Sequence, residues 1–299
     1  MERKRIGFGG WRLIGVIVAA AWVVMAEAPS AELLQTGRAK LGEIGDAVVT
    51  VKIVSSVKVS WSGQPGEENE MKNEARGTVV SPDGVTIVSL AEIDPAQFWQ
   101  NMMGGRMGEE VRYETSLKDI RLLLSNGTEI PAEVVLRDHD LDVAVVRPRT
   151  RPEQPMTFVD LKQSAGADYF DPIICISRMG MVGQRQLRVM TGEIQGIVKK
   201  PRLYYVPVPA ADDLGPGVPV FNAEGKVIGL LLMKSVPSSA DSSSNTQDSY
   251  MTIILPADDI QQIVAQAPER GAKEPGASVE GSQTAAPDAK GTEKKQTDE

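Results

Sequence analysis

Alternating apolar and polar residues recur in short runs along most of the chain, and this period of two predicts β-strands. The longest run spans residues 47–61 and is rich in β-branched side chains. Further runs occur at residues 76–80, 85–90, 120–124, 130–136, 141–147, 158–161, 172–177, 187–198, 203–208, 218–221, 227–233 and 251–254. Because so many short strands follow one another without intervening helices, the pattern predicts an all-β barrel or sandwich.

Turn residues separate several of the predicted strands. Ser81-Pro82-Asp83-Gly84 has proline and glycine at the positions that favour a reverse turn, and Asn126-Gly127 is a strong hairpin signal. The polar residues 63–73 and the long segment 92–118 carry no such alternation, so both are predicted to be loops.

Helical periodicity is confined to the two sides of this strand-rich region. Residues 29–45 form an N-terminal segment with a predicted short helix. Residues 256–267 place Ile260, Ile263 and Val264 at helical spacing, with two aspartates in the first turn, where carboxylates suit the helix dipole. The pattern therefore predicts a helix that closes the folded region.

The two ends of the chain have different compositions from the rest. Residues 1–28 combine a basic start, an uncharged apolar stretch at 13–25 and small residues for cleavage, which predicts a secretory signal. The apolar stretch is shorter than the ~20 residues that span a bilayer. We therefore expect cleavage and export to the periplasm or the extracellular space, with an uncleaved membrane anchor as the alternative. Residues 268–299 are polar and predicted to be disordered.

Composition limits the chemistry that the chain can support. The 299 residues are 41% hydrophobic, enough for a sizeable core, and the net charge of -8 argues against nucleic-acid binding. Cys175 is the only cysteine, so no internal disulfide can form, and its apolar neighbours predict a buried, inert thiol. His139 is the only histidine and lies in an acidic stretch that predicts an exposed turn. These two residues provide too few ligands for a transition-metal site, and no motif predicts a cofactor.

One loop has the residues of a shaped site. In Leu214-Gly215-Pro216-Gly217-Val218-Pro219-Val220-Phe221-Asn222, glycines and prolines fix a tight turn, and an apolar run follows it. The chain then turns at Asn222–Gly225 and returns as a strand at Val227-Ile228-Gly229.

This loop and three other segments resemble, in order and spacing, the HtrA-type trypsin-like serine proteases. The segments are Gly77-Thr78-Val79-Val80-Ser81-Pro82-Asp83-Gly84, Asp142-Val143-Ala144-Val145, the loop with the strand after it, and Ile254-Leu255-Pro256. The resemblance implies two six-stranded β-barrels packed face to face over residues 46–267, divided near residues 150–165, with a C-terminal helix. It also implies a member without the C-terminal PDZ domain that many relatives carry, because only the polar tail follows.

The resemblance places the catalytic triad on residues that cannot perform its chemistry. The family's histidine falls on Ala91, its aspartate on Asp142 and its serine on Pro216. The general base and the nucleophile are therefore absent, and the aspartate has no imidazole to orient. We expect Asp142 to be a buried carboxylate held by hydrogen bonds from the backbone and from neighbouring hydroxyl groups.

The resemblance also identifies Leu214, Gly215 and Pro216 as the former oxyanion loop. Proline has no backbone N–H, so Pro216 cannot supply the donor that a serine at this position gives to an oxyanion hole. Leu214 and Val218 replace two glycines of the family pattern, so their β-carbons crowd a loop that active relatives keep open.

The resulting prediction is an exported pseudoprotease that binds a peptide or a protein, through the cleft or through the loop at 92–118. The apolar residues of that loop are Phe98, Trp99, Met102, Met103 and Met107. The simpler interpretation of the loop is a cover over one barrel. Two alternatives remain for the function: an active endopeptidase with a displaced nucleophile and His139 as its base, and a structural, envelope-associated scaffold. The sequence sets no oligomeric state.

Overall fold

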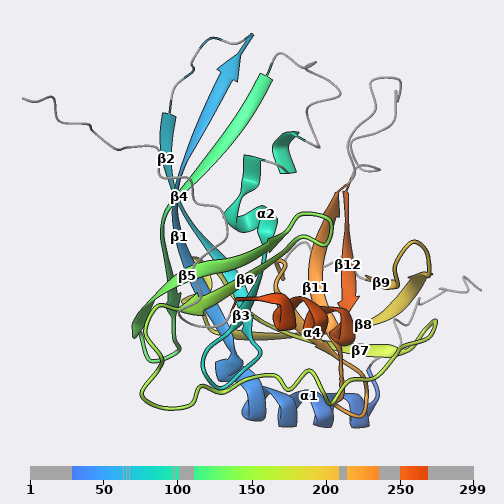
Figure 1. Ribbon diagram of the computed structural model, residues 1–299. Coiled ribbons are helices and arrows are strands. Elements are labelled where there is room, and N and C mark those ends of the chain that lie inside the picture. Colours follow the sequence, from blue (N-terminus) through green and yellow to red (C-terminus); the bar gives the residue numbers. More distant parts are fainter. Residues whose placement is uncertain are drawn as a thin grey trace, which may run out of the picture.

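The computed structural model describes residues 29–268 except 63, 65, 67, 97, 101–110, 209–213 and 236–249. It contains two closed barrels of six antiparallel strands and a C-terminal helix, which confirms the predicted fold class (Figure 1). The predicted signal segment, the polar tail after residue 268, and Met102, Met103 and Met107 lie outside the described residues.

The first barrel has the strand order β1-β2-β3-β6-β5-β4. Its strands are β1 (Val48–Trp61), β2 (Glu68–Val79), β3 (Thr86–Ser89), β4 (Val111–Leu123), β5 (Glu129–Asp138) and β6 (Val143–Pro148). The second barrel has the order β10-β11-β12-β9-β8-β7. Its strands are β7 (Pro172–Arg178), β8 (Leu187–Val198), β9 (Tyr204–Val208), β10 (Val218–Phe221), β11 (Val227–Ser235) and β12 (Tyr250–Pro256).

Helices pack against the second barrel. In α1 (Ala31–Ile44), the Ser30 hydroxyl caps the first turn by accepting from the Leu33 N–H at 3.2 Å, and the buried Leu33 belongs to the core. In α4 (Ala257–Gln266), Ile260 and Ile263 are buried on the face that meets β11 and β12, as their helical spacing predicts. No helix within the described residues is long and apolar enough to cross a membrane.

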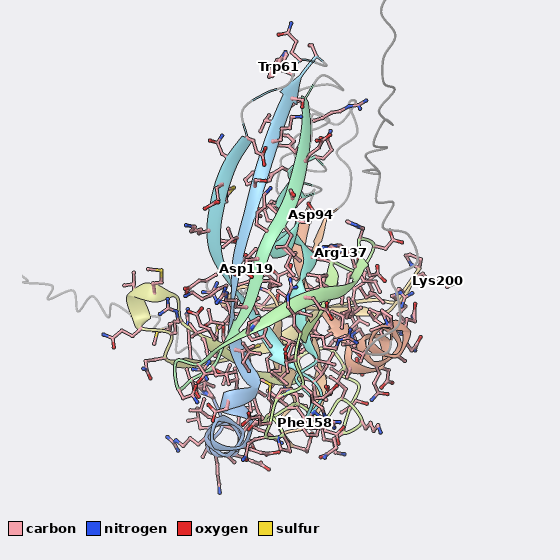
Figure 2. All side chains as sticks on the ribbon, turned by 60° about the vertical axis from the view of Figure 1, so that its left-hand side comes forward. Trp61, Asp94, Asp119, Arg137, Phe158 and Lys200 are labelled. Atoms are coloured by element: carbon pink, nitrogen blue, oxygen red, sulfur yellow. The ribbon has the colours of Figure 1, made fainter. Side chains whose placement is uncertain are left out.

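Polar strands extend the first barrel beyond the expected hairpins. The polar residues predicted to be a loop include the start of β2 at Glu68, which pairs along β1 to Lys58 (Figure 2). Likewise, β4 begins at Val111, inside the predicted loop at 92–118, and pairs with Trp61 at the far end of β1. The loop predictions were therefore wrong for residues 68–73 and 111–118, because backbone pairing with a long neighbouring strand stabilises these segments without apolar alternation.

The segment between the barrels corrects another prediction. Residues 158–161 form no strand and instead run as an extended connection. The Val159 N–H donates to the Val79 carbonyl oxygen at 2.9 Å, and Val159 and Leu161 are buried. The apolar pattern here reflects burial between two barrels, which period-two reasoning does not distinguish from a strand.

A buried arginine ties the two barrels together. Arg178, at the end of β7, is 8% exposed and donates to the backbone carbonyls of Gly45 and Arg185, each at 3.1 Å, and of Val48. Asp46 lies 3.6 Å from the guanidinium group. Because Val48 begins the first barrel, this side chain fixes how the second barrel is seated against it.

Candidate functional site

Ala91 and Asp142 are in direct contact. The strand β3 ends at Ser89, and the short helix α2 (Leu90–Ile93) follows, so Ala91 lies in the first turn of that helix. Its backbone N–H donates to Oδ1 of Asp142 at 2.7 Å, and the Leu90 N–H donates to the Asp142 carbonyl at 3.0 Å. Asp142 joins β5 to β6 and has a positive φ of 56°, which an aspartate tolerates better than most residues.

Donors from both barrels converge on the Asp142 carboxyl group. Its Oδ2 accepts from the Ser89 hydroxyl at 2.5 Å and from the backbone N–H of Met233, on β11 of the second barrel, at 3.1 Å. Burial raises the pKa of Asp142 to about 7, against the opposing effect of these donors, and the nearby negative charge of Glu92 raises it further. The carboxyl group therefore bridges the barrels as a structural acceptor.

The loop at 214–217 is packed shut against the first barrel. The Leu214 side chain is fully buried, and the Leu214 carbonyl accepts from the Ser177 hydroxyl at 2.8 Å. The Thr78 hydroxyl donates to the Gly217 carbonyl at 2.8 Å, and the Gly217 N–H donates to the Leu231 carbonyl at 2.7 Å. These bonds hold the loop between β2 and β11.

Glycine is required where this loop meets β2. Gly215 and Gly217 have φ values of 73° and 88°, a region that side chains disfavour. A Cβ at position 217 would lie 2.4 Å from the Arg76 carbonyl oxygen, and one at 215 would lie 2.9 Å from an Arg76 guanidinium nitrogen. The backbone of the loop therefore lies so close to Arg76 that only glycine fits at these two positions.

Pro216 lies on this closed loop, next to the residue that approaches Ser89. It is buried, and a Cβ on the next residue, Gly217, would lie 3.6 Å from the Ser89 backbone nitrogen. Ser89 also donates its hydroxyl to Asp142, so this residue lies near both the loop, at Gly217, and the carboxyl group. Pro216 has neither a side-chain hydroxyl group nor a backbone N–H to offer.

The cavity at this junction is small. Its volume is about 30 Å³, room for roughly one water molecule. The lining residues include Leu90, Ala91, Phe98, His139, Asp142 and Ser235. A peptide side chain does not fit into this space.

Phe98, an aromatic residue of the predicted partner loop, lines this cavity and contacts two other rings. The ring centroid of Phe98 lies 5.9 Å from that of Trp99 and 6.0 Å from that of Tyr250, both in edge-to-face arrangements. Tyr250 begins β12, so Phe98 links the segment after α2 to the second barrel. For the described part of the loop, this placement favours the interpretation as a cover.

His139 is exposed in the turn before Asp142, as its sequence context predicts. It has no hydrogen-bond partner within the described residues, although it lines the same cavity as Ser235. The sequence predicted hydroxyl and backbone donors to a buried Asp142, but it did not identify Ser89 and Met233 as those donors. The Ser89 hydroxyl two residues before Ala91 was a weak signal, whereas nothing in the sequence pointed to a backbone donor at Met233.

The remaining reactive side chain is buried. Cys175 is 2% exposed, and burial raises the pKa of its thiol to about 12, so it carries almost no thiolate at neutral pH. Within the described ranges, no group of three or more His, Cys, Asp or Glu residues is placed to hold a metal ion.

Comparisons with known proteins identify a family. A family model for the trypsin-like peptidase domain matches residues 75–230, from β2 to β11. Among solved structures, the chain is similar to the apo crystal structure of the MamO protease domain from Magnetospirillum magneticum. The match covers 74% of this chain and 96% of that domain, with 14% sequence identity and a TM-score of 0.43. No curated protein matches the chain.

Proposed function

The chain belongs to the trypsin-like peptidase domain family, and from this premise we propose that it is an exported pseudoprotease, which binds a peptide or protein partner without cleaving it. The observation that carries the proposal is the environment of Asp142. Its carboxyl group accepts from the backbone N–H of Ala91, where an active relative has a histidine, and the neighbouring loop carries Pro216 in place of a nucleophile.

Each missing group has a kinetic consequence. Removing one oxyanion donor costs about 10²–10³ in rate. Removing the nucleophile or the base leaves only the residual acceleration that the oxyanion hole and substrate binding supply. Here Pro216 removes the nucleophile and a donor together, so the residual acceleration is impaired as well.

The shape of the cleft supports binding at its rim rather than catalysis inside it. Phe98 lines the cavity of about 30 Å³, and Tyr250, whose ring contacts that of Phe98, is 38% exposed. Partly exposed apolar and aromatic side chains of this kind are common in protein interfaces. We therefore assign partner contact to this rim.

The test is to incubate the purified protein with reduced, unfolded casein and, separately, with a fluorophosphonate probe. We expect casein to bind, seen as a rise in fluorescence anisotropy of the labelled casein, and to remain intact on a gel. We also expect no serine to take the probe. Hydrolysis of casein, or labelling that one serine substitution abolishes, would contradict the proposal.

The second candidate is an endopeptidase with a displaced nucleophile, favoured by the shared cavity of His139, Asp142 and Ser235. It requires a serine hydroxyl within hydrogen-bond reach of the imidazole during catalysis. Ser235→Ala and His139→Ala distinguish the two candidates in the same assays. A displaced active site predicts that each variant loses casein hydrolysis, whereas a pseudoprotease predicts that wild type and both variants give the same background.

A further inference from the structure

One side of β2 has no neighbouring strand over most of its length. The strand pairs with β1 from Glu68 to Thr78 but with β3 only from Gly77 to Val79. Within the described residues no other strand joins its outer side, and β2 lies at the margin of the extended sheet in Figure 1. Residues 68–72 are all exposed. This edge therefore presents backbone donors and acceptors that an extended peptide can satisfy.

A fixed apolar turn stands beside the lower part of this edge. The turn η2 (Met181–Gly183) connects β7 to β8, and at its tip Met181 is 69% exposed and Val182 fully exposed. Within the turn, the Gly183 N–H donates to the Gly180 carbonyl at 3.0 Å, and the Gln184 N–H to the Met181 carbonyl at 2.9 Å. The apolar tip is therefore held in place by its own backbone.

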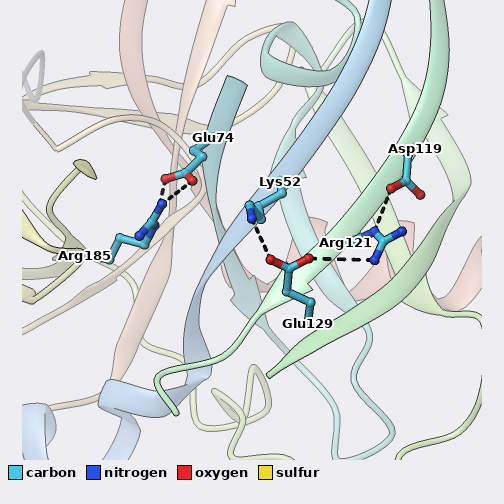
Figure 3. A network of polar contacts seen from close by, with 6 residues as sticks. All are labelled: Lys52, Glu74, Asp119, Arg121, Glu129 and Arg185. Atoms are coloured by element: carbon cyan, nitrogen blue, oxygen red, sulfur yellow. Dashed lines mark hydrogen bonds and ion pairs between the residues drawn. The ribbon is translucent and has the colours of Figure 1, made fainter. Parts of the chain in front are cut away.

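An ion pair attaches this turn to β2. Two guanidinium nitrogens of Arg185 donate to the two carboxylate oxygens of Glu74, at 2.9 and 2.6 Å (Figure 3). Gln184 and Arg185 both have positive φ, at 53° and 56°, so the backbone is strained where the pair forms. A bidentate pair fixes geometry as well as charge, and here it sets the distance between the tip and the strand edge.

A groove lies between the tip and the outer face of the sheet. Its volume is about 580 Å³, within the range of sites that hold ligands. The exposed side chains of Met181 and Val182 line this groove together with Lys72, Glu74 and Arg76 of β2. On the sheet face beyond them, Lys52 pairs with Glu129 at 2.6 Å and Arg121 with Asp119 at 2.7 Å, shown in Figure 3.

We propose that this groove and the open edge of β2 bind an extended segment of a partner protein, which adds to the sheet as an antiparallel strand. The surface lies outside the cavity at Asp142, so the inference goes beyond the proposed function. An added strand leaves the core undisturbed, because Glu68–Lys72 are exposed and their outer backbone side carries no other strand.

The side chains along the edge specify the partner's chemistry. Glu70, Lys72 and Glu74 occupy every second position of β2 and so share one face of the strand. Cross-strand pairing favours a partner with a basic residue opposite Glu70 and an acidic residue opposite Lys72. Near Glu74 the partner's residue should be apolar, because it would contact Met181 and Val182. In an antiparallel partner the order is apolar, acidic, basic, at every second residue.

The charged residues of the edge restrict which strands can pair with it. Lys72 pairs with Glu70 at 3.2 Å, and both side chains are well exposed, so this contact contributes little and is readily exchanged for partner charges. Charged residues on an edge strand deter pairing with uncharged segments. The edge therefore selects a complementary charge pattern.

The probe is a fluorescein-labelled synthetic peptide in which every second residue is threonine. The residues between the threonines are isoleucine, glutamate and lysine, in that order. We expect fluorescence anisotropy to show saturable binding of this peptide. The double variant Met181→Asp, Val182→Asp should lower the affinity ~10-fold or more, because an apolar contact is lost. Val208→Asp, on an exposed valine of β9, is the matched control and should bind as wild type does. A peptide N-methylated on the backbone groups that face β2 should not bind.

A charge exchange tests the register. The double variant Glu70→Lys, Lys72→Glu should bind the peptide more weakly than wild type does. A second peptide, in which glutamate and lysine are exchanged, should bind this variant with the affinity that wild type has for the first peptide. Absence of binding, equal binding by the Met181/Val182 variant, or indifference to the charge exchange would overturn the proposal. Self-association of the wild type that the same variants abolish would assign the edge to a second copy of this chain and overturn it too. None of these outcomes bears on casein hydrolysis.

Discussion

Replacing Asp142 with asparagine tests whether one carboxyl group makes the stability of the barrel junction depend on pH. Burial raises the pKa of Asp142 from 3.8 to about 7 in the folded protein. A shift of roughly three units corresponds to about 4 kcal/mol between the two protonation states, at 1.36 kcal/mol per unit. This is a large part of the 5–15 kcal/mol by which a typical domain is stable.

The sign follows from the direction of the shift. The folded state holds the proton more tightly than the unfolded chain, so the contribution of Asp142 to stability is fully present below pH 4 and is lost as pH rises through about 7. Asparagine stays neutral throughout. The free energy of unfolding of wild type minus that of Asp142→Asn should therefore fall by about 4 kcal/mol between pH 4 and pH 8.

Guanidinium unfolding followed by tryptophan fluorescence, at steps from pH 4 to pH 8.5, measures this difference. Glu153→Gln, at an exposed carboxyl group, is the control and should follow the wild-type curve. Ser89→Ala removes a donor that lowers the pKa of Asp142, so it should move the loss of stability to higher pH. A difference between wild type and Asp142→Asn that stays constant across the range would refute the reasoning.

Two further substitutions test the contacts that seat the barrels. Gly217→Ala should destabilise the protein by roughly 2–4 kcal/mol in guanidinium unfolding, because its Cβ would meet the Arg76 carbonyl at 2.4 Å with a φ of 88°. The matched Gly42→Ala, in a helix with open space around the position, should instead stabilise by about 0.5–1 kcal/mol. Arg178→Met should lower the free energy of unfolding in urea by roughly 3 kcal/mol, because buried backbone carbonyls lose their donor. The control Arg202→Met, which removes an exposed ion pair, should lower it by less than about 1 kcal/mol. Equal effects within either pair of variants would contradict these assignments.

The resemblance to HtrA-type proteases is confirmed at the level of the trypsin-like peptidase family, with both barrels and the closing helix. The signals behind it are local. Proline and glycine in fixed positions define the turn before β3, and Asn126-Gly127 does so for the hairpin of β4 and β5. Such turns need no distant partner, which is why they can be predicted from the residues alone.

The resemblance to the family's motifs placed the triad positions at Ala91 and Pro216, but it could not supply the surroundings of these residues. The closure of the loop depends on Thr78 and Arg76, which lie far from Gly217 in the sequence. Phe98, which lines the small cavity, comes from a segment that the sequence predicted only as a loop. A missing residue can be identified from a pattern, whereas the shape of the space around it depends on tertiary packing.

The sequence by itself predicted the strands, and through its resemblance to a protease family it placed Ala91 and Pro216 where that family has a histidine and a serine. Only the tertiary structure decided that Glu68–Asn73 form an open strand edge, that Arg178 joins the barrels, and that Met233 completes the donors to Asp142. The physical reason is that polar strands and buried charges are stabilised by partners dozens of residues away. Periodicity reports which side of an element is apolar, but not which distant backbone group it meets.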